Sequence, residues 1–72
     1  MHIEEEWMLF REFREPRAAE GLSLWLRNEQ VAARAEGNAV FIPRSQRHRA
    51  GWVVSHLPPT EEDLKLLAAN AA

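Results

Sequence analysis

Seventy-two residues leave room for one domain with one small core, and a hydrophobic content of 46% excludes an intrinsically disordered chain. The sequence has no cysteine, which excludes disulfides and thiolate metal sites, and no apolar run approaches the ~18 residues of a membrane span. A formal net charge of −2 gives no general attraction to nucleic acid, so a nucleic-acid partner is not expected.

The first expected element is a strand over residues 7–13, where aromatic side chains and period-two alternation indicate one better-buried face. A helix should begin at Pro16. The N–H groups of the first helical turn have no intrahelical acceptor, so the N–H that proline lacks is not missed there. Apolar residues then recur at three- and four-residue steps, and the positions expected to face a sheet are Ala19, Leu22 and Leu26. Gly21 costs this helix about 1 kcal/mol, which a close approach between helix and sheet would explain.

A β-hairpin is expected after the helix. Residues 31–35 alternate in polarity, but their alanines have poor β-propensity, so the first arm should be a weak strand. Gly37-Asn38 tolerates positive φ and should form the tight turn into a second arm over residues 39–42. In that arm Val40 and Ile42 share one face, which is expected to be the buried one.

Residues 46–57 are compatible with a helix or a strand. The apolar side chains fall at i, i+3, i+4 and i+7, the spacing of one helix face: Ala50, Val53, Val54 and Leu57. Ser45 is a candidate N-cap for that helix. Gly51 and the β-prone run 52–54 favour a strand instead, so both assignments stay open, although the spacing favours the helix.

Pro58-Pro59 should end this segment, and Thr60 should cap a short C-terminal helix with acidic residues in its first turn. One side of that helix is expected to carry Leu64, Leu67 and Ala68. The sequence therefore predicts a single small α+β domain over residues 1–72, with the order β-α-β-β-α. We expect a core over about residues 7–57, a three-stranded sheet with two helices on one face, and the Pro-Pro break and short C-terminal helix in residues 58–72.

The histidines, serines and glycines, which form metal, catalytic or phosphate sites in other proteins, form no recognisable site here. In a helix, His48 and His56 would lie about 12 Å apart, too far to share a metal ion. None of the three serines stands in a Gly-x-Ser-x-Gly motif, and the three glycines do not form a phosphate-binding loop. We therefore expect no catalytic residue, no metal ligand and no cofactor in this chain.

One junction resembles a known family. The motif Phe13-x-x-Pro16-Arg17-x-Ala19, followed by the hairpin arm Val40-Phe41-Ile42 and by Ser45-Gln46 before the second helix, is similar to the N-terminal cytoplasmic domain of bacterial rhomboid intramembrane serine proteases. The similarity continues through Pro58-Pro59 to the run 67–69 and covers roughly residues 8–69.

The resemblance implies a non-catalytic accessory domain at the cytoplasmic face of a membrane. It would affect the stability, assembly or membrane contact of a parent protease whose catalytic serine and histidine lie in membrane helices not present here. Its partners would be the parent's membrane domain and an anionic membrane surface. The alternative is a stand-alone signal-transducing or protein- or ligand-binding module, because a small bacterial family with a fold similar to nitrogen-regulatory signal proteins has the same element order.

The candidate membrane or partner surface is the only cluster of cations, Arg44, Arg47 and Arg49, with Trp52 beside it. A basic side chain near an anionic leaflet gains about 1 kcal/mol, and tryptophan is enriched at membrane interfaces. The alternative is an ordinary solvated basic face with Trp52 in the core.

Overall fold

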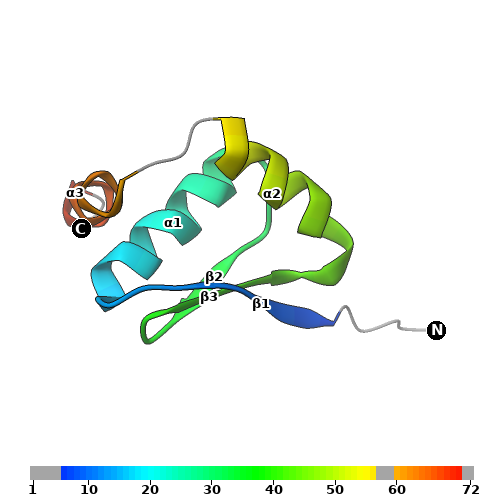
Figure 1. The fold of residues 1–72 in the computed structure, drawn as a ribbon, viewed down its shortest axis with the longest axis horizontal. Helices are drawn as coiled ribbons and strands as arrows, with labels where there is room; N and C mark the ends of the chain where they lie inside the picture. Colours follow the sequence, from blue (N-terminus) through cyan, green and yellow to red (C-terminus); the bar gives the residue numbers. More distant parts are fainter. Residues whose placement is uncertain (1–5, 57–59, 71–72) are drawn as a thin grey trace.

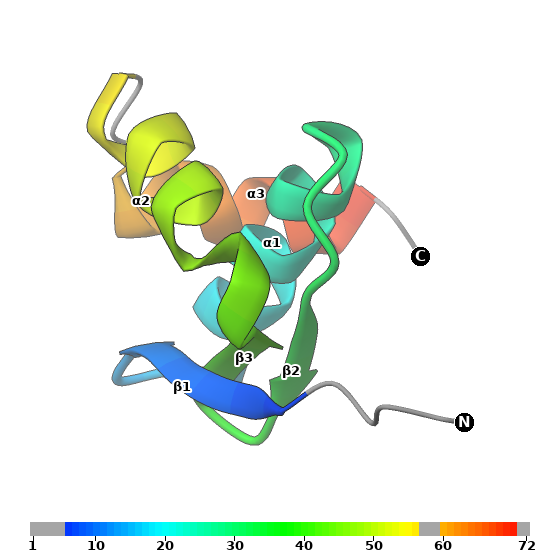
Figure 2. The same ribbon diagram turned by 90° about the vertical axis from the view of Figure 1, so that its right-hand side faces the viewer.

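The computed structural model describes residues 6–56 and 60–70. Its elements are β1 (Trp7–Glu12), α1 (Pro16–Asn28), β2 (Arg34–Glu36), β3 (Ala39–Pro43), the 3-10 turn η1 (Arg44–Gln46), α2 (Arg47–His56) and α3 (Glu61–Asn70), as Figure 1 shows. The three strands form one antiparallel sheet in the order β1-β3-β2. α1 and α2 cover the same face of this sheet, and α3 lies against α1 (Figure 2). The expected α+β architecture is confirmed.

The hairpin between β2 and β3 forms as the sequence predicts. Glu36 pairs with Ala39, which leaves Gly37-Asn38 as a two-residue turn, and Gly37 has a φ of 62°. The first arm is shorter than expected, because β2 begins only at Arg34. The residues before it still bury two side chains in the core, Val31 and Ala33, and this explains their alternation.

The core lies between the sheet and the two helices that cover it. The stripe Ala19, Leu22 and Leu26 of α1 is buried, as are Val40 and Ile42 of β3. These are the side chains that period and alternation assigned to the core. The burial of Ala18 beside this stripe shows that α1 is more enclosed than a helix resting only on a sheet.

The glycine inside α1 marks the contact that encloses this helix. A Cβ atom on Gly21 would overlap the backbone carbonyl of Leu64, and it would lie 2.9 Å from the Leu64 Cα atom. A close approach at Gly21 therefore exists, and its partner is α3 and not the sheet that would also have explained the glycine. A side chain at this position would hold the two helices apart.

Residues 47–56 form a helix, which settles the open choice between helix and strand. Ala50, Val53 and Val54 are buried on its inner side, whereas Leu57 lies outside the described residues. The helix begins at Arg47, after η1, and so two residues later than Ser45, the candidate N-cap.

α3 begins as predicted and packs through fewer side chains than predicted. The Thr60 hydroxyl oxygen accepts a hydrogen bond from the Asp63 N–H at 3.1 Å, and the Asp63 carboxylate accepts one from the Thr60 N–H at 3.4 Å. This reciprocal pair is a capping box with Asp in the place of Glu. Leu64 and Ala68 are buried, but Leu67 is 36% exposed, so α3 buries a narrower stripe than expected. Pro58-Pro59 lies outside the described residues.

Over residues 6–56 and 60–70, no helix has the length and apolar character that crossing a membrane requires.

Candidate functional site

The segment formed by η1 and α2 carries positive charge without any compensating acid of its own. Residues 44–56 contain three arginines and two histidines and no aspartate or glutamate. The whole chain carries −2 and this segment +3, so the other residues together carry −5. The local charge is thus opposite in sign to the rest of the protein, and it favours contact with an anionic partner.

The structure does not bring the four predicted surface residues together on one flat face. Arg44 forms an exposed ion pair with Glu6, with 3.2 Å between Nη1 and Oε2. Arg47 and Arg49 are two positions apart in α2, which places them roughly 200° apart around the helix axis. All three arginines are exposed. Arg47 and Arg49 therefore flank α2 on opposite sides, with Trp52 on the outer face between them.

Arg49 and Trp52 belong to a stacked column that the sequence analysis did not identify. The Arg49 guanidinium carbon lies 5.9 Å from the centroid of the Trp52 ring, and the His56 ring stacks on that indole at 4.0 Å with 29° between the planes. The three residues stand at i, i+3 and i+7, the spacing that puts side chains on one side of a helix. Trp52 remains 55% exposed and is not a core residue.

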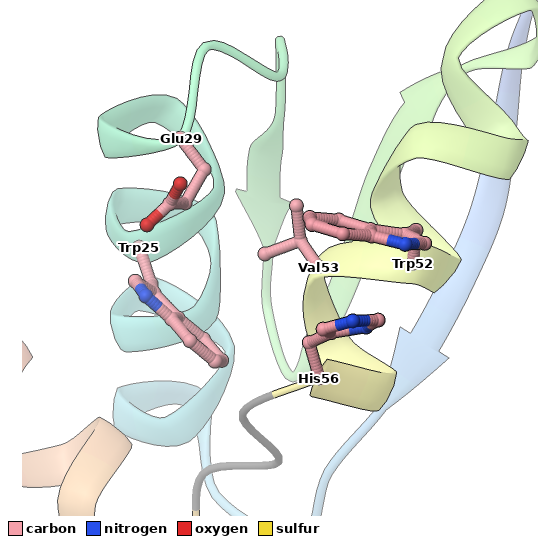
Figure 3. Close-up of a pocket in the computed structure, with 5 residues that line it drawn as sticks. All are labelled: Trp25, Glu29, Trp52, Val53 and His56. Carbon is pink, nitrogen blue, oxygen red and sulfur yellow. The ribbon is translucent and has the colours of Figure 1, made fainter.

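Two residues of this column, Trp52 and His56, form one wall of a pocket of about 330 Å³ between α1 and α2, and Arg49 lies beside that wall. The opposite wall is built from α1 and the residue that follows it, as Figure 3 shows. The lining residues are Trp25, Glu29, Trp52, Val53 and His56. Val53 is buried and points from α2 toward α1 (Figure 3), so apolar surface dominates the interior.

Among the described residues, Glu29 is the one carboxylate that lines this pocket. It stands four residues after Trp25, so its side chain lies one helical turn beyond the indole (Figure 3). The Glu29 carbonyl oxygen accepts a hydrogen bond from Arg49 Nη2 at 3.4 Å. Among the described residues its carboxylate has neither a hydrogen bond nor an ion pair, although the residue is half-buried. An apolar pocket with an unpaired carboxylate is suited to a ligand that brings positive charge.

The sequence contained a signal for this pocket. Trp25 in α1 and Glu29, the residue that follows α1, are spaced i, i+4, and Trp52 and His56 are spaced i, i+4 in α2. Each pair is a visible helical neighbourhood. That the two pairs face each other depends on how α1 and α2 pack, which no local pattern specifies.

The described residues contain no group of three or more histidine, cysteine, aspartate or glutamate side chains that could hold a metal ion. The expected spacing between His48 and His56 along α2 holds, because both lie in one continuous helix.

Comparison with known proteins finds no matching family model, no similar curated protein and no similar solved structure.

Proposed function

We propose that this chain is a non-catalytic accessory domain that contacts an anionic membrane surface through Arg44, Arg47, Arg49 and Trp52. The observation that carries the proposal is the segment 44–56, which has a charge of +3, no acidic residue and a tryptophan that is more than half exposed. The parent protein would be an intramembrane serine protease of the rhomboid type, whose cytoplasmic N-terminal domain the sequence resembles. The β-α-β-β-α order of the fold is compatible with that assignment.

The expected binding is weak. Each basic side chain close to an anionic leaflet contributes about 1 kcal/mol, and this attraction is screened over about 8 Å at physiological salt. Arg44 contributes less than the others, because Glu6 already pairs with it. The acidic first turn of α3 opposes binding less than its charge suggests, because α3 packs on the side of α1 that is away from α2 (Figure 1). Such an interaction orients a domain that its parent already holds at the membrane.

The direct test is co-sedimentation of the whole chain with vesicles of increasing anionic lipid content at low salt. Bound protein should increase with anionic content and decrease as salt is added. The triple variant Arg44→Gln, Arg47→Gln, Arg49→Gln should lose this binding. A matched variant removes three exposed arginines elsewhere, Arg11→Gln, Arg14→Gln, Arg17→Gln, and should retain it. Binding that ignores anionic content, or an equal loss in both triple variants, would rule out this surface.

The second candidate is a stand-alone ligand- or protein-binding module, which the pocket between α1 and α2 favours. The two candidates differ in the gene that encodes the chain. An accessory domain of an intramembrane protease requires apolar segments of about 20 residues in the same reading frame, whereas a stand-alone module requires none. Reading the coding sequence beyond Ala72 separates them.

A further inference from the structure

We propose that the pocket between α1 and α2 binds a small zwitterion in which a methylated ammonium group is joined to a phosphate, the chemistry of a phosphocholine-type lipid headgroup. This inference rests on the proposed membrane contact for its source of ligand. It goes beyond that contact because it assigns headgroup recognition to different residues, Trp25, Glu29 and His56, and gives Arg49 a second role.

The cationic end of the ligand is assigned to the α1 side of the pocket. Trp25 presents its indole there, and Glu29, a half-buried residue, places its carboxylate one turn beyond it (Figure 3). Aromatic rings attract cations through their quadrupole, and quaternary ammonium groups are the ligands that aromatic pockets of this kind recognise. A bare ammonium group has three N–H donors to satisfy, but the lining offers one carboxylate. A methylated ammonium therefore fits this largely apolar lining better.

The anionic end is assigned to the α2 edge of the pocket, where Arg49 lies beside the lining residues Glu29 and Trp52. Arg49 uses one of its donors on the Glu29 carbonyl oxygen, and its guanidinium lies near the Trp52 ring. A guanidinium has five N–H donors, so Arg49 retains donors for a phosphate. The structure shows no ion pair between Arg49 and the Glu29 carboxylate among the described residues, and both charges are therefore available to a ligand. His56, exposed at the end of α2, adds a further donor.

The size and openness of the pocket agree with a headgroup. A volume of about 330 Å³ lies at the lower end of the ~300–1,000 Å³ of small-ligand sites, which suits a headgroup and not a whole lipid. Trp52, in the wall of the pocket, is 55% exposed and belongs to the surface proposed to meet the membrane. The acyl chains would then remain in the bilayer while the headgroup enters between the helices.

Simpler ligands fit the charges less well. An organic cation without an anionic group would be repelled by Arg49 and by the +3 charge of residues 44–56. A simple anion would be repelled by the Glu29 carboxylate. An apolar side chain of a partner protein would fill the pocket but leave that carboxylate unpaired and desolvated, which is unfavourable. Only a ligand with both charges matches both the Glu29 carboxylate in the pocket and the Arg49 guanidinium at its edge.

The test is an NMR titration of the whole chain with soluble phosphocholine, phosphoethanolamine, choline and inorganic phosphate, without lipid. Phosphocholine should shift the indole N–H signals of Trp25 and Trp52, leave that of Trp7 unchanged, and bind more tightly than the other three. Glu29→Gln and Arg49→Gln should each weaken phosphocholine binding on the order of tenfold. The matched variants Glu20→Gln and Arg17→Gln, at exposed positions of α1, should bind as the natural chain does.

Three results would overturn the inference: no indole shift at millimolar phosphocholine, equally tight binding of choline or phosphate alone, or unchanged affinity in Glu29→Gln. Phosphatidylcholine vesicles should compete with soluble phosphocholine, and a failure to compete would exclude the lipid as the source. Because the titration contains no anionic membrane, its outcome is independent of the co-sedimentation with anionic vesicles. The pocket and the basic surface can therefore fail separately.

Discussion

Gln30 ends α1 in a backbone conformation that is unfavourable for a residue with a Cβ atom. Its φ is 67°, in the left-handed region where glycine is the usual residue. The Val31 N–H donates to the Leu26 carbonyl at 2.9 Å, and the Gln30 N–H donates to the Arg27 carbonyl at 3.1 Å. These two bonds define a Schellman motif, so the end of α1 is a regular one occupied by a strained glutamine.

Replacing Gln30 with glycine should therefore stabilise the protein. Removing the side chain relieves a left-handed conformation that costs about 1–2 kcal/mol in a residue with a Cβ, less the extra backbone entropy of glycine in the unfolded state. The net gain expected is about 0.5–1 kcal/mol in the free energy of unfolding, measured by urea denaturation. Gln30→Ala is the control, because alanine keeps the Cβ and should bring no such gain. A lower stability of Gln30→Gly than of the natural chain would contradict this account of the helix end.

At the scale of elements, the contact between α1 and α3 is held at two points. Gly21 allows the backbone of α3 to approach at Leu64. Near the start of α1, Lys65 of α3 pairs with Glu15 at 2.8 Å and with Glu62 of its own helix at 3.0 Å. The glycine sets how close the helices lie, and the lysine links the middle of α3 to Glu15, the residue before α1.

Two glycine-to-alanine substitutions should have opposite effects. Gly51 in α2 has open space around its Cβ position, so Gly51→Ala should gain about 1 kcal/mol of helix propensity. Gly21→Ala gains the same propensity, but its methyl group would overlap the Leu64 backbone, and overpacking typically costs about 1–3 kcal/mol. Thermal melts should show a higher midpoint for Gly51→Ala and a lower one for Gly21→Ala. A stabilised Gly21→Ala would mean that α3 does not pack here.

The Lys65 ion pairs should make stability depend on alkaline pH. The hydrogen bonds that the Lys65 ammonium donates, first to Glu15 and then to Glu62, raise the pKa of Lys65 above its usual value. A raised pKa means that the stabilisation is fully present below the unfolded value of about 10.4 and is lost as the pH rises through the folded value. The melting midpoint of the natural chain should therefore decrease more between pH 9 and pH 12 than that of Lys65→Met. Equal decreases would indicate that these pairs do not stabilise the docked α3.

At the scale of the whole molecule, the local sequence pattern was enough to predict the helices and strands, but it could not predict which of them contact each other. Alternation identified β1, and the stripe of Ala19, Leu22 and Leu26 identified the buried side of α1. The partner of Gly21 could not be predicted, because two helices distant in sequence meet there. The pocket was missed for the same reason. Its walls are two separate i, i+4 pairs that only the packing of α1 against α2 brings together.

Charge and fold together give the molecule two different sides. The arginines of the basic segment 44–56 and Trp52 are exposed on the helical side. On the other side, Trp7 and Leu9 are exposed on β1, where Met8 between them packs against the core. Trp7 is already in contact with a cation of its own, the Arg34 guanidinium, 4.6 Å from its ring. The proposed function requires that the helical side, and not this side of β1, meets the membrane.

The most direct test of that requirement is an NMR map of the whole chain with anionic bicelles. Backbone amide shifts should concentrate in residues 44–56, and among the three tryptophan indoles that of Trp52 should move most while that of Trp7 stays in place. Arg47→Gln combined with Arg49→Gln should reduce these shifts. Shifts that concentrate on Trp7 and Leu9, with residues 44–56 unchanged, would contradict the claim that the η1–α2 segment is the binding surface.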